Sequence, residues 1–253
     1  MILFVFEGEE REPRLYRTLE RLYFPKGNDN IVLSFGNNLY ELYNELKEYG
    51  AGGDIVPLLR QRLARRGCAA LDGVRASDIA QIFLFFDYDF QNAQLPLDEI
   101  NKRVEEMLAL FDDETGNGKL YINYPMVESI WYTKELPDEA YARYTVSRED
   151  CKDFKRLARE FSAYKSLDHI LFKEGESPTK EKYLKVKYNW QHLKSMNVRK
   201  ANLLTTGHYA MPSEKSAVNQ QAVFEAQLAQ AVCPKEQVAV LNAFPIFIFD
   251  YMK

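Results

Sequence analysis

The sequence predicts an α/β protein in which a mostly parallel sheet is flanked by helices and followed by a helical C-terminal extension. Two short segments, 2–6 (ILFVF) and 82–86 (IFLFF), are apolar at every position, as in strands that are buried on both faces. Segments whose apolar residues recur with helical spacing lie between them. Strand-like segments become rare beyond about residue 125, so we expect the sheet to come from the first half of the chain.

Strands and helices alternate through this first half. The strand at 2–6 is followed by Pro13, which is typical of a first helical turn, and by apolar residues with helical spacing as far as Tyr23. The next expected elements are a strand at 31–35, helices at 39–46 and 55–63, a strand at 81–89 that ends in carboxylates, a helix at 100–111 and a strand at 119–123. Such alternation is typical of βαβ units and a parallel sheet.

The second half has mainly helical patterns. We expect helices at 125–134, 148–165, 179–196 and 214–232. The closing segment 243–249 (AFPIFIF) is apolar throughout, and it fits either a strand or a buried helix. The change of pattern suggests an α/β domain at 1–135 and a mostly helical region at 136–253 that packs on it.

Composition narrows the class of protein. The net charge of −4 comes from 33 basic and 37 acidic residues, so no overall positive field attracts nucleic acid and any such contact needs a local basic patch. The three cysteines are odd in number and lack CxxC spacing, which favours a reducing compartment. No apolar run approaches the roughly 20 residues of a membrane span. We therefore expect a soluble cytoplasmic protein without membrane contact.

Acidic residues follow both of the strongly apolar strands. Glu7 comes directly after the first, and Asp87 and Asp89 end the other. If these strands are neighbours, all three carboxylates meet at one sheet edge, with Tyr88 pointing away. Two such charges about 4 Å apart repel by roughly 4 kcal/mol at an effective dielectric near 20. A divalent cation would offset this repulsion, and oxygen ligands suit Mg²⁺ or Mn²⁺.

Each of these acidic motifs also has a simpler interpretation. A glutamate at the end of a strand is usually a solvated turn residue, and a DxD motif alone is common. Glu9 and Glu10 are expected to be solvated bystanders of this kind. The combination of a strand-ending glutamate with a second apolar strand that ends in DxD favours a shared metal site.

The order of these motifs resembles the Toprim fold of topoisomerases, primases and OLD-type nucleases. The opening EGEEREP at 7–13 is similar to the EGExxTEP opening of RloB-like and PARIS-type phage-defence Toprim proteins, with Arg11 in place of the usual threonine. The stretch YPMVES at 124–129 resembles their YPxxE stretch. The resemblance covers residues 1–135 and adds Glu12 and Glu128 to Glu7, Asp87 and Asp89 as metal ligands.

The resemblance implies a Toprim-like catalytic domain with Mg²⁺-dependent endonuclease activity on DNA or RNA, tRNA included. Asp87 and Asp89 would hold the cation, and Glu7 would act as a general base or acid or as a further ligand. The resemblance also implies a toxic effector of antiphage defence that is controlled by a partner ATPase or sensor protein. A homodimer is compatible with these expectations. The glycine-rich loop at 50–53 lacks the Lys-Ser/Thr pair of a P-loop, so we do not expect this chain to hydrolyse ATP.

A basic and aromatic stretch at 180–200 is the candidate nucleic-acid surface. It holds seven Lys or Arg residues against one Glu, with aromatic rings between them that could stack on bases. The predicted contact residues are Lys182, Lys185, Lys187, Lys194, Arg199 and Lys200. The equally weighted alternative is a solvated amphipathic helix whose aromatic residues face the core.

Three other functions fit parts of the pattern. A DxD glycosyltransferase would use Asp87 and Asp89 to bind a metal and a nucleotide sugar, but it leaves Glu7 without a role. A phosphatase with Asp87 as nucleophile is weaker, because that signature usually follows the first strand. A non-catalytic module derived from the same fold would bind a partner without cleaving a substrate.

Overall fold

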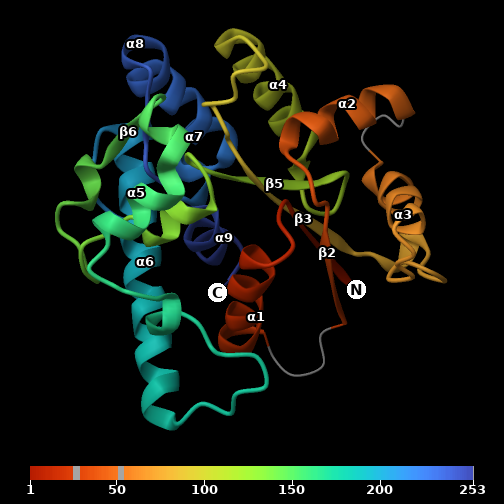
Figure 1. Ribbon diagram of the computed structural model, residues 1–253, viewed down its shortest axis with the longest axis horizontal. Coiled ribbons are helices and arrows are strands. Elements are labelled where there is room, and N and C mark those ends of the chain that lie inside the picture. The colour runs from red at the N-terminus through yellow and green to blue at the C-terminus, as the bar shows by residue number, and fades with distance from the viewer. Residues whose placement is uncertain (25–28, 51–53, 253) are drawn as a thin grey trace.

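The computed structural model describes residues 1–24, 29–50 and 54–252. Residues 51–53 of the glycine-rich loop lie outside the described residues. The expected fold class is confirmed: the chain is an α/β protein with a mostly parallel five-stranded sheet, flanking helices and a helical C-terminal region (Figure 1).

The sheet has the strand order β2-β1-β3-β5-β4. Its strands are β1 (Ile2–Phe6), β2 (Asn30–Ser34), β3 (Gln81–Asp87), β4 (Asp112–Asp113) and β5 (Gly118–Asn123). β1 pairs in parallel with both β2 and β3, β3 pairs in parallel with β5, and only the short β4 is antiparallel. The all-apolar sequences of β1 and β3 follow from this topology, because their central position leaves both faces covered.

Helices cover both faces of the sheet. The helices of the first half are α1 (Arg11–Tyr23), α2 (Leu39–Tyr49), α3 (Ile55–Arg65) and α4 (Leu97–Leu110). α1 lies against one face together with the C-terminal helix α9 (Ala243–Tyr251), and α2, α3 and α4 lie against the other (Figure 1). Asn38 and Asp54 begin α2 and α3 by accepting hydrogen bonds from the N–H groups of Glu41 (3.0 Å) and Val56 (3.2 Å).

The segment 243–249, which the sequence left open, is a buried helix. Asn242 begins α9 by accepting a hydrogen bond from the N–H of Phe244 (3.1 Å). Phe244 stacks on Phe85 of β3 with ring centroids 4.7 Å apart, and Phe247 meets Phe83 edge to face at 5.1 Å. The C-terminal region therefore completes the core of the sheet, and one hydrophobic cluster includes buried residues from both halves of the chain.

Two helices expected in the second half are much shorter in the structure. Over 125–134 there is only a 3-10 helix, Val127–Trp131, because Asp138 accepts hydrogen bonds from the N–H groups of Lys134 (2.8 Å) and Ala140 (2.9 Å) and closes a turn instead. Over 148–165 a 3-10 turn, Asp150–Asp153, precedes the short helix α5 (Phe154–Phe161). These expectations of continuous helix were wrong.

The helix expected at 179–196 is longer than predicted. It forms α6 (Lys180–Thr206), which starts where Thr179 caps the N–H of Lys182 and ends at Gly207, whose φ of +81° favours glycine. The helix expected at 214–232 is interrupted, because Asn219 caps a new start for α7 (Gln220–Gln227). A π-helical turn, Leu228–Val232, and α8 (Cys233–Lys235) follow.

A second, two-stranded sheet lies in the half where no strands were expected. It pairs β6 (Thr145–Ser147) with β7 (Gln237–Ala239) in antiparallel orientation. Its strands have three residues each, too few to give a clear alternating pattern. Within the described ranges, no helix has the length and apolar character needed to cross a membrane.

Candidate functional site

The sheet order creates a crevice between the ends of β1 and β3. The chain passes from β1 to β2 on one side and later returns to β3 on the other, so the direction of winding reverses between these two strands. In open parallel sheets, ligands bind beyond the carboxyl ends of the strands at such a point. Glu7 directly follows β1, and Asp87 ends β3, opposite Asn123 at the end of β5. The predicted convergence of Glu7 and Asp87 at one edge is therefore present.

Hydrogen bonds fix Glu7, Asp87 and Asn123 relative to one another. The N–H of Asp87 donates to Oε2 of Glu7 (2.9 Å), and the side-chain amide of Asn123 donates to Oδ1 of Asp87 (2.9 Å). The Asn123 carbonyl oxygen accepts from the N–H of Ala243 (2.9 Å), so α9 orients the amide that holds Asp87. The neighbouring strands and α9 thus position these carboxylates before any ligand arrives.

Asp89 reaches the same cavity through a turn. β3 ends at Asp87, and Asp89 has φ +46°, a left-handed conformation that Asp tolerates better than most residues. Its Oδ1 accepts a hydrogen bond from the Gln91 amide (2.9 Å), and its cavity of about 410 Å³ is also lined by Glu7 and Asp87. Tyr88 is fully buried and does not line this cavity, as expected.

The two further acids suggested by the family resemblance also lie at this edge. Glu12 is buried in the first turn of α1, and its Oε1 accepts from the N–H of Gly8 (3.0 Å). Gly8 leaves room for this carboxylate, since a Cβ there would lie 2.7 Å from Oε2 of Glu12. Glu128 is buried, and its Oε1 pairs with Arg11. Its Oε2 has no hydrogen-bond partner among the residues that the structure describes.

Burial and mutual repulsion favour the neutral forms of these acids. Burial, followed by repulsion from Glu7 and Asp89, raises the pKa of Asp87 well above its ordinary value. Burial and then Asp89 raise the pKa of Glu7 in the same way. Burial is also the main reason why the pKa values of Asp89 and Glu12 are raised. These four carboxyl groups are close enough to disfavour one another's charge.

Only limited positive charge from the described chain offsets this cluster. Lys155 of α5 lines the same cavity, and its Nζ lies 3.9 Å from Oε1 of Glu128. Arg11 pairs with the same oxygen of Glu128. Lys152 also lines the cavity but is paired with Glu149 (2.5 Å), and Asp153, a further lining acid, is paired with Arg156 (2.6 Å). Glu7, Asp87 and Asp89 form no ion pair within the described residues, so the cluster can accept an additional cation.

The side chains of the cavity have the chemistry to bind a hard divalent cation, although they are not arranged as a complete ligand set. Glu7, Asp87 and Asp89 offer only oxygen atoms, as Mg²⁺ and Mn²⁺ prefer. Among residues 1–24, 29–50 and 54–252, no group of three or more His, Cys, Asp or Glu side chains lies close enough together to hold a metal ion without rearrangement. Oε2 of Glu7 accepts the hydrogen bond from the Asp87 N–H, so Oε1 is the oxygen that Glu7 can offer to a cation.

Comparisons of the chain with protein-family models, curated proteins and solved structures found no match in any of the three. The Toprim resemblance of residues 1–135 therefore stays a prediction from short motifs. What the structure adds is the position of each of the five acids.

The basic stretch on α6 does not form one exposed surface. Lys200 is only 1% exposed, and its Nζ donates to the carbonyl oxygen of Tyr144 (2.5 Å), so it cannot take part in a nucleic-acid surface. Lys182 is paired with Glu176 (2.7 Å). Of the aromatic residues in this stretch, Trp190 is fully buried, as the alternative expected, whereas Tyr188 is exposed. Lys185 and Arg199 are exposed, and Lys187 and Lys194 are half-buried.

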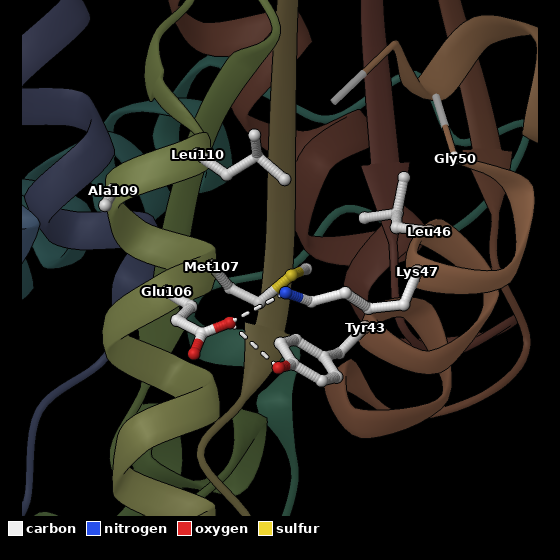
Figure 2. A pocket seen from close by; sticks show the side chains of 8 residues that line it. All are labelled: Tyr43, Leu46, Lys47, Gly50, Glu106, Met107, Ala109 and Leu110. Atoms are coloured by element: carbon white, nitrogen blue, oxygen red, sulfur yellow. Dashed lines mark hydrogen bonds and ion pairs between the residues drawn. The ribbon is translucent and has the colours of Figure 1, made fainter. Parts of the chain in front are cut away.

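A larger pocket lies elsewhere, between α2 and α4. It has a volume of about 560 Å³ and mainly apolar walls, including Leu46 and Met107. Figure 2 shows the Glu106 carboxylate between the Tyr43 hydroxyl (2.8 Å) and Lys47 Nζ (3.1 Å). The ionisable groups that line this pocket are thus paired with one another, and the pocket lacks the converging carboxylates of the β1–β3 crevice.

Sequence reasoning missed three residues of the site. Asn123 ends a predicted strand, so the rule that placed Glu7 and Asp87 at the sheet edge could also have placed Asn123 there. Gln91 follows DxD by two residues and had no distinguishing signal. Lys155 lay within a predicted helix, and only the tertiary packing of α5 brings it to the cavity.

Proposed function

We propose that this chain is a metal-dependent endonuclease that hydrolyses phosphodiester bonds of DNA or RNA. The observation that carries the proposal is the cavity at the β1–β3 switch point, where Glu7, Asp87 and Asp89 converge from separate segments and Lys155 faces them. Buried acids that disfavour one another's charge are typical of functional sites, because a structural role rarely requires them. The cellular role in antiphage defence and the partner ATPase stay predictions from the family resemblance.

Each residue of the cavity would have a distinct task. Asp87 and Asp89 would hold Mg²⁺ or Mn²⁺, with Glu12 and Glu128 nearby as further oxygen donors. A bound cation would stabilise charge on the phosphate and lower the pKa of a coordinated water. Glu7, which shares the cavity, would accept the proton of the attacking water. Lys155 would face the negative charge of the phosphate.

The position of Glu7 separates this proposal from the other candidate functions. A DxD glycosyltransferase has no need of Glu7, yet here Glu7 shares the cavity and bonds directly to the Asp87 backbone. A phosphatase would require Asp87 as a free nucleophile, yet Asp87 is only 7% exposed and is held by Asn123. A non-catalytic binding module would retain metal binding without cleavage.

The test is cleavage of plasmid DNA and of total tRNA in the presence of Mg²⁺ or Mn²⁺. We expect Glu7→Gln to lower the cleavage rate by about 10²–10⁴-fold, the usual contribution of a general base, and Asp87→Asn to abolish detectable cleavage. Asp72→Asn is the matched control, because Asp72 is exposed and lines a different pocket that shares no residue with the carboxylate cavity. Absence of cleavage by the wild-type chain, or equal activity in Asp87→Asn, would refute the proposal.

A further inference from the structure

We propose that a basic pocket beside the carboxylate cavity binds a backbone phosphate of a single nucleic-acid strand. The pocket lies between the start of α1, the 3-10 helix Val127–Trp131 and the segment from the end of α5 to residue 171. It has a volume of about 260 Å³, several times the roughly 30 Å³ share of one water molecule, so a polyatomic anion fits. This inference rests on the proposed function, because it assigns the substrate contacts of the same enzyme.

The lining of this pocket is strongly basic. Arg11, Arg14, Arg159 and Lys165 stand against one acid, Asp168. Arg11 is paired with Glu128, whereas Arg14, Arg159 and Lys165 form no ion pair or side-chain hydrogen bond within the described part of the chain. Trp131 forms an apolar wall that is only 8% exposed, with the Arg159 guanidinium 5.9 Å from its ring centroid. Three cationic groups are therefore available to an anion.

A chain of charged residues connects this pocket to the candidate active site. Arg11 lines the basic pocket and pairs with Glu128. Lys155 approaches the same Glu128 carboxylate at 3.9 Å and lines the cavity of Glu7, Asp87 and Asp89. When the scissile phosphate of a nucleic-acid strand lies over the carboxylates, a neighbouring phosphate of the same strand would thus lie at the basic pocket.

The basic surface continues along α1. Arg14 is shared with a second cavity of about 310 Å³, which Arg17, Arg21 and Lys173 line together with the acids Glu20 and Glu174. Arg17 is paired with Glu174 (2.9 Å), whereas Arg14, which lines both cavities, has no ion pair within the described residues. Arg11, Arg14, Arg17 and Arg21 follow one another at intervals of three or four residues, so they share one helix face and extend over about 15 Å. The segment after α5 runs beside this face, where Phe172 N–H bonds to Thr18 (3.1 Å) and Arg21 bonds to the Glu176 carbonyl (2.8 Å) (Figure 1).

This geometry suits the sugar-phosphate backbone of one nucleic-acid strand. Arg14, Arg159 and Lys165, which have no ion pair among the described residues, line one small pocket beside a single helix, which suits one strand better than the wide surface of a duplex. Guanidinium groups bind phosphate oxygens in bidentate fashion, which makes arginine well suited to this role. Trp131 is too buried to stack on a base, so we expect contacts to the phosphates without strong sequence preference.

The test measures binding of fluorescein-labelled single-stranded oligonucleotides by fluorescence anisotropy in EDTA, so that metal-dependent cleavage does not occur. One probe is DNA and the other is RNA of the same sequence. We expect the double variant Arg159→Gln/Lys165→Gln to bind at least about tenfold more weakly. The slope of log affinity against log salt should become shallower by about 0.7, because the pocket holds one phosphate and each lost phosphate contact on a single strand contributes about 0.7.

The matched control is Arg65→Gln/Lys102→Gln, which removes the same charge from exposed positions of α3 and α4, on the sheet face opposite α1. We expect it to bind almost as well as the wild type. Equal losses in the two double variants, or no loss in Arg159→Gln/Lys165→Gln, would overturn the inference. Binding is measured without metal, so it is independent of cleavage. If the wild-type protein cleaves nothing but Arg159→Gln/Lys165→Gln weakens its binding, the basic pocket is supported and the nuclease proposal is refuted. If the wild-type protein cleaves nucleic acid but Arg159→Gln/Lys165→Gln binds as tightly as the wild type, the nuclease proposal is supported and the basic pocket is refuted.

Discussion

Asp87 combines more constraints than any other described residue of the candidate site. It ends the central strand β3, its N–H bonds to Glu7, and its carboxylate accepts from Asn123. It is also 7% exposed and surrounded by other acids, which accounts for its raised pKa. A buried carboxylate held in this way destabilises the folded chain when it is charged and no cation is present.

This constraint predicts a pH-dependent effect of Asp87→Asn in EDTA. The folded state favours the neutral form of Asp87, so the stability that this group contributes is fully present below its unfolded pKa of about 3.9 and is lost as pH rises through the raised folded pKa. Asparagine resembles the neutral form at every pH. The variant should therefore melt above the wild type at neutral pH, by roughly 2–4 °C for each kcal/mol of destabilisation relieved.

Thermal melts across the acidic and neutral range provide the measurement, with Asp72→Asn as the control. The advantage of Asp87→Asn over the wild type should shrink as the pH falls toward about 4. An advantage that grows on acidification, or that appears equally in Asp72→Asn, would contradict the assignment of Asp87 as a buried, repelled carboxylate.

At the scale of elements, the four parallel strands of the main sheet could be predicted well, whereas the short strands β4, β6 and β7 and several helices could not. β1 and β3 are short and apolar throughout because they are central in a parallel sheet, and few other structures give that pattern. The helices beyond residue 125 are interrupted by side-chain bonds of Asp138 and Asn219, which compete with the helix locally. The segment that forms α9 has no polar face, so its sequence carried no period to distinguish helix from strand.

The packing of α9 predicts a large loss of stability for Phe247→Ala. Phe247 is fully buried, and its ring meets Phe4 (5.9 Å), Phe83 (5.1 Å) and Phe85 (5.3 Å) on the sheet. Removing it leaves a cavity between α9 and the sheet, at a cost of about 3–5 kcal/mol in the free energy of unfolding. Urea denaturation measures this loss.

The control for this prediction is Tyr188→Ala, which removes an aromatic ring that is 59% exposed on α6. We expect a change within about 0.5 kcal/mol for this variant. If Phe247→Ala lowers the free energy of unfolding as little as Tyr188→Ala does, α9 does not form part of the core of the sheet.

At the scale of the whole molecule, the candidate site could be predicted in part. Parallel strands bring their carboxyl ends to one edge, so Glu7, Asp87 and Asp89 could be placed together from the positions of two strands alone. Lys155 and the Arg11–Glu128 pair depend on how α5 and the 3-10 helix Val127–Trp131 pack against that edge. That packing is tertiary, and no local pattern records it.

The burial of Lys200 has the same cause. The basic and aromatic residues of α6 suggested a nucleic-acid surface, but the segment before β6, which includes Tyr141 and Tyr144, covers the side of the helix that holds Lys200. The basic surface that adjoins the acidic cavity is formed instead by α1 and α5, which lie far apart in the sequence. A prediction that treats each helix separately cannot find a surface that two helices build together.

The central claim is that the acids at the β1–β3 crevice hold a divalent cation, and titration of the protein with Mn²⁺ in a calorimeter tests it most directly. We expect the wild type and Asp72→Asn to bind Mn²⁺ with the same affinity. Asp87→Asn should bind at least about tenfold more weakly, a difference of roughly 1.4 kcal/mol. Absence of Mn²⁺ binding by the wild type, or equal binding by Asp87→Asn, would contradict the claim.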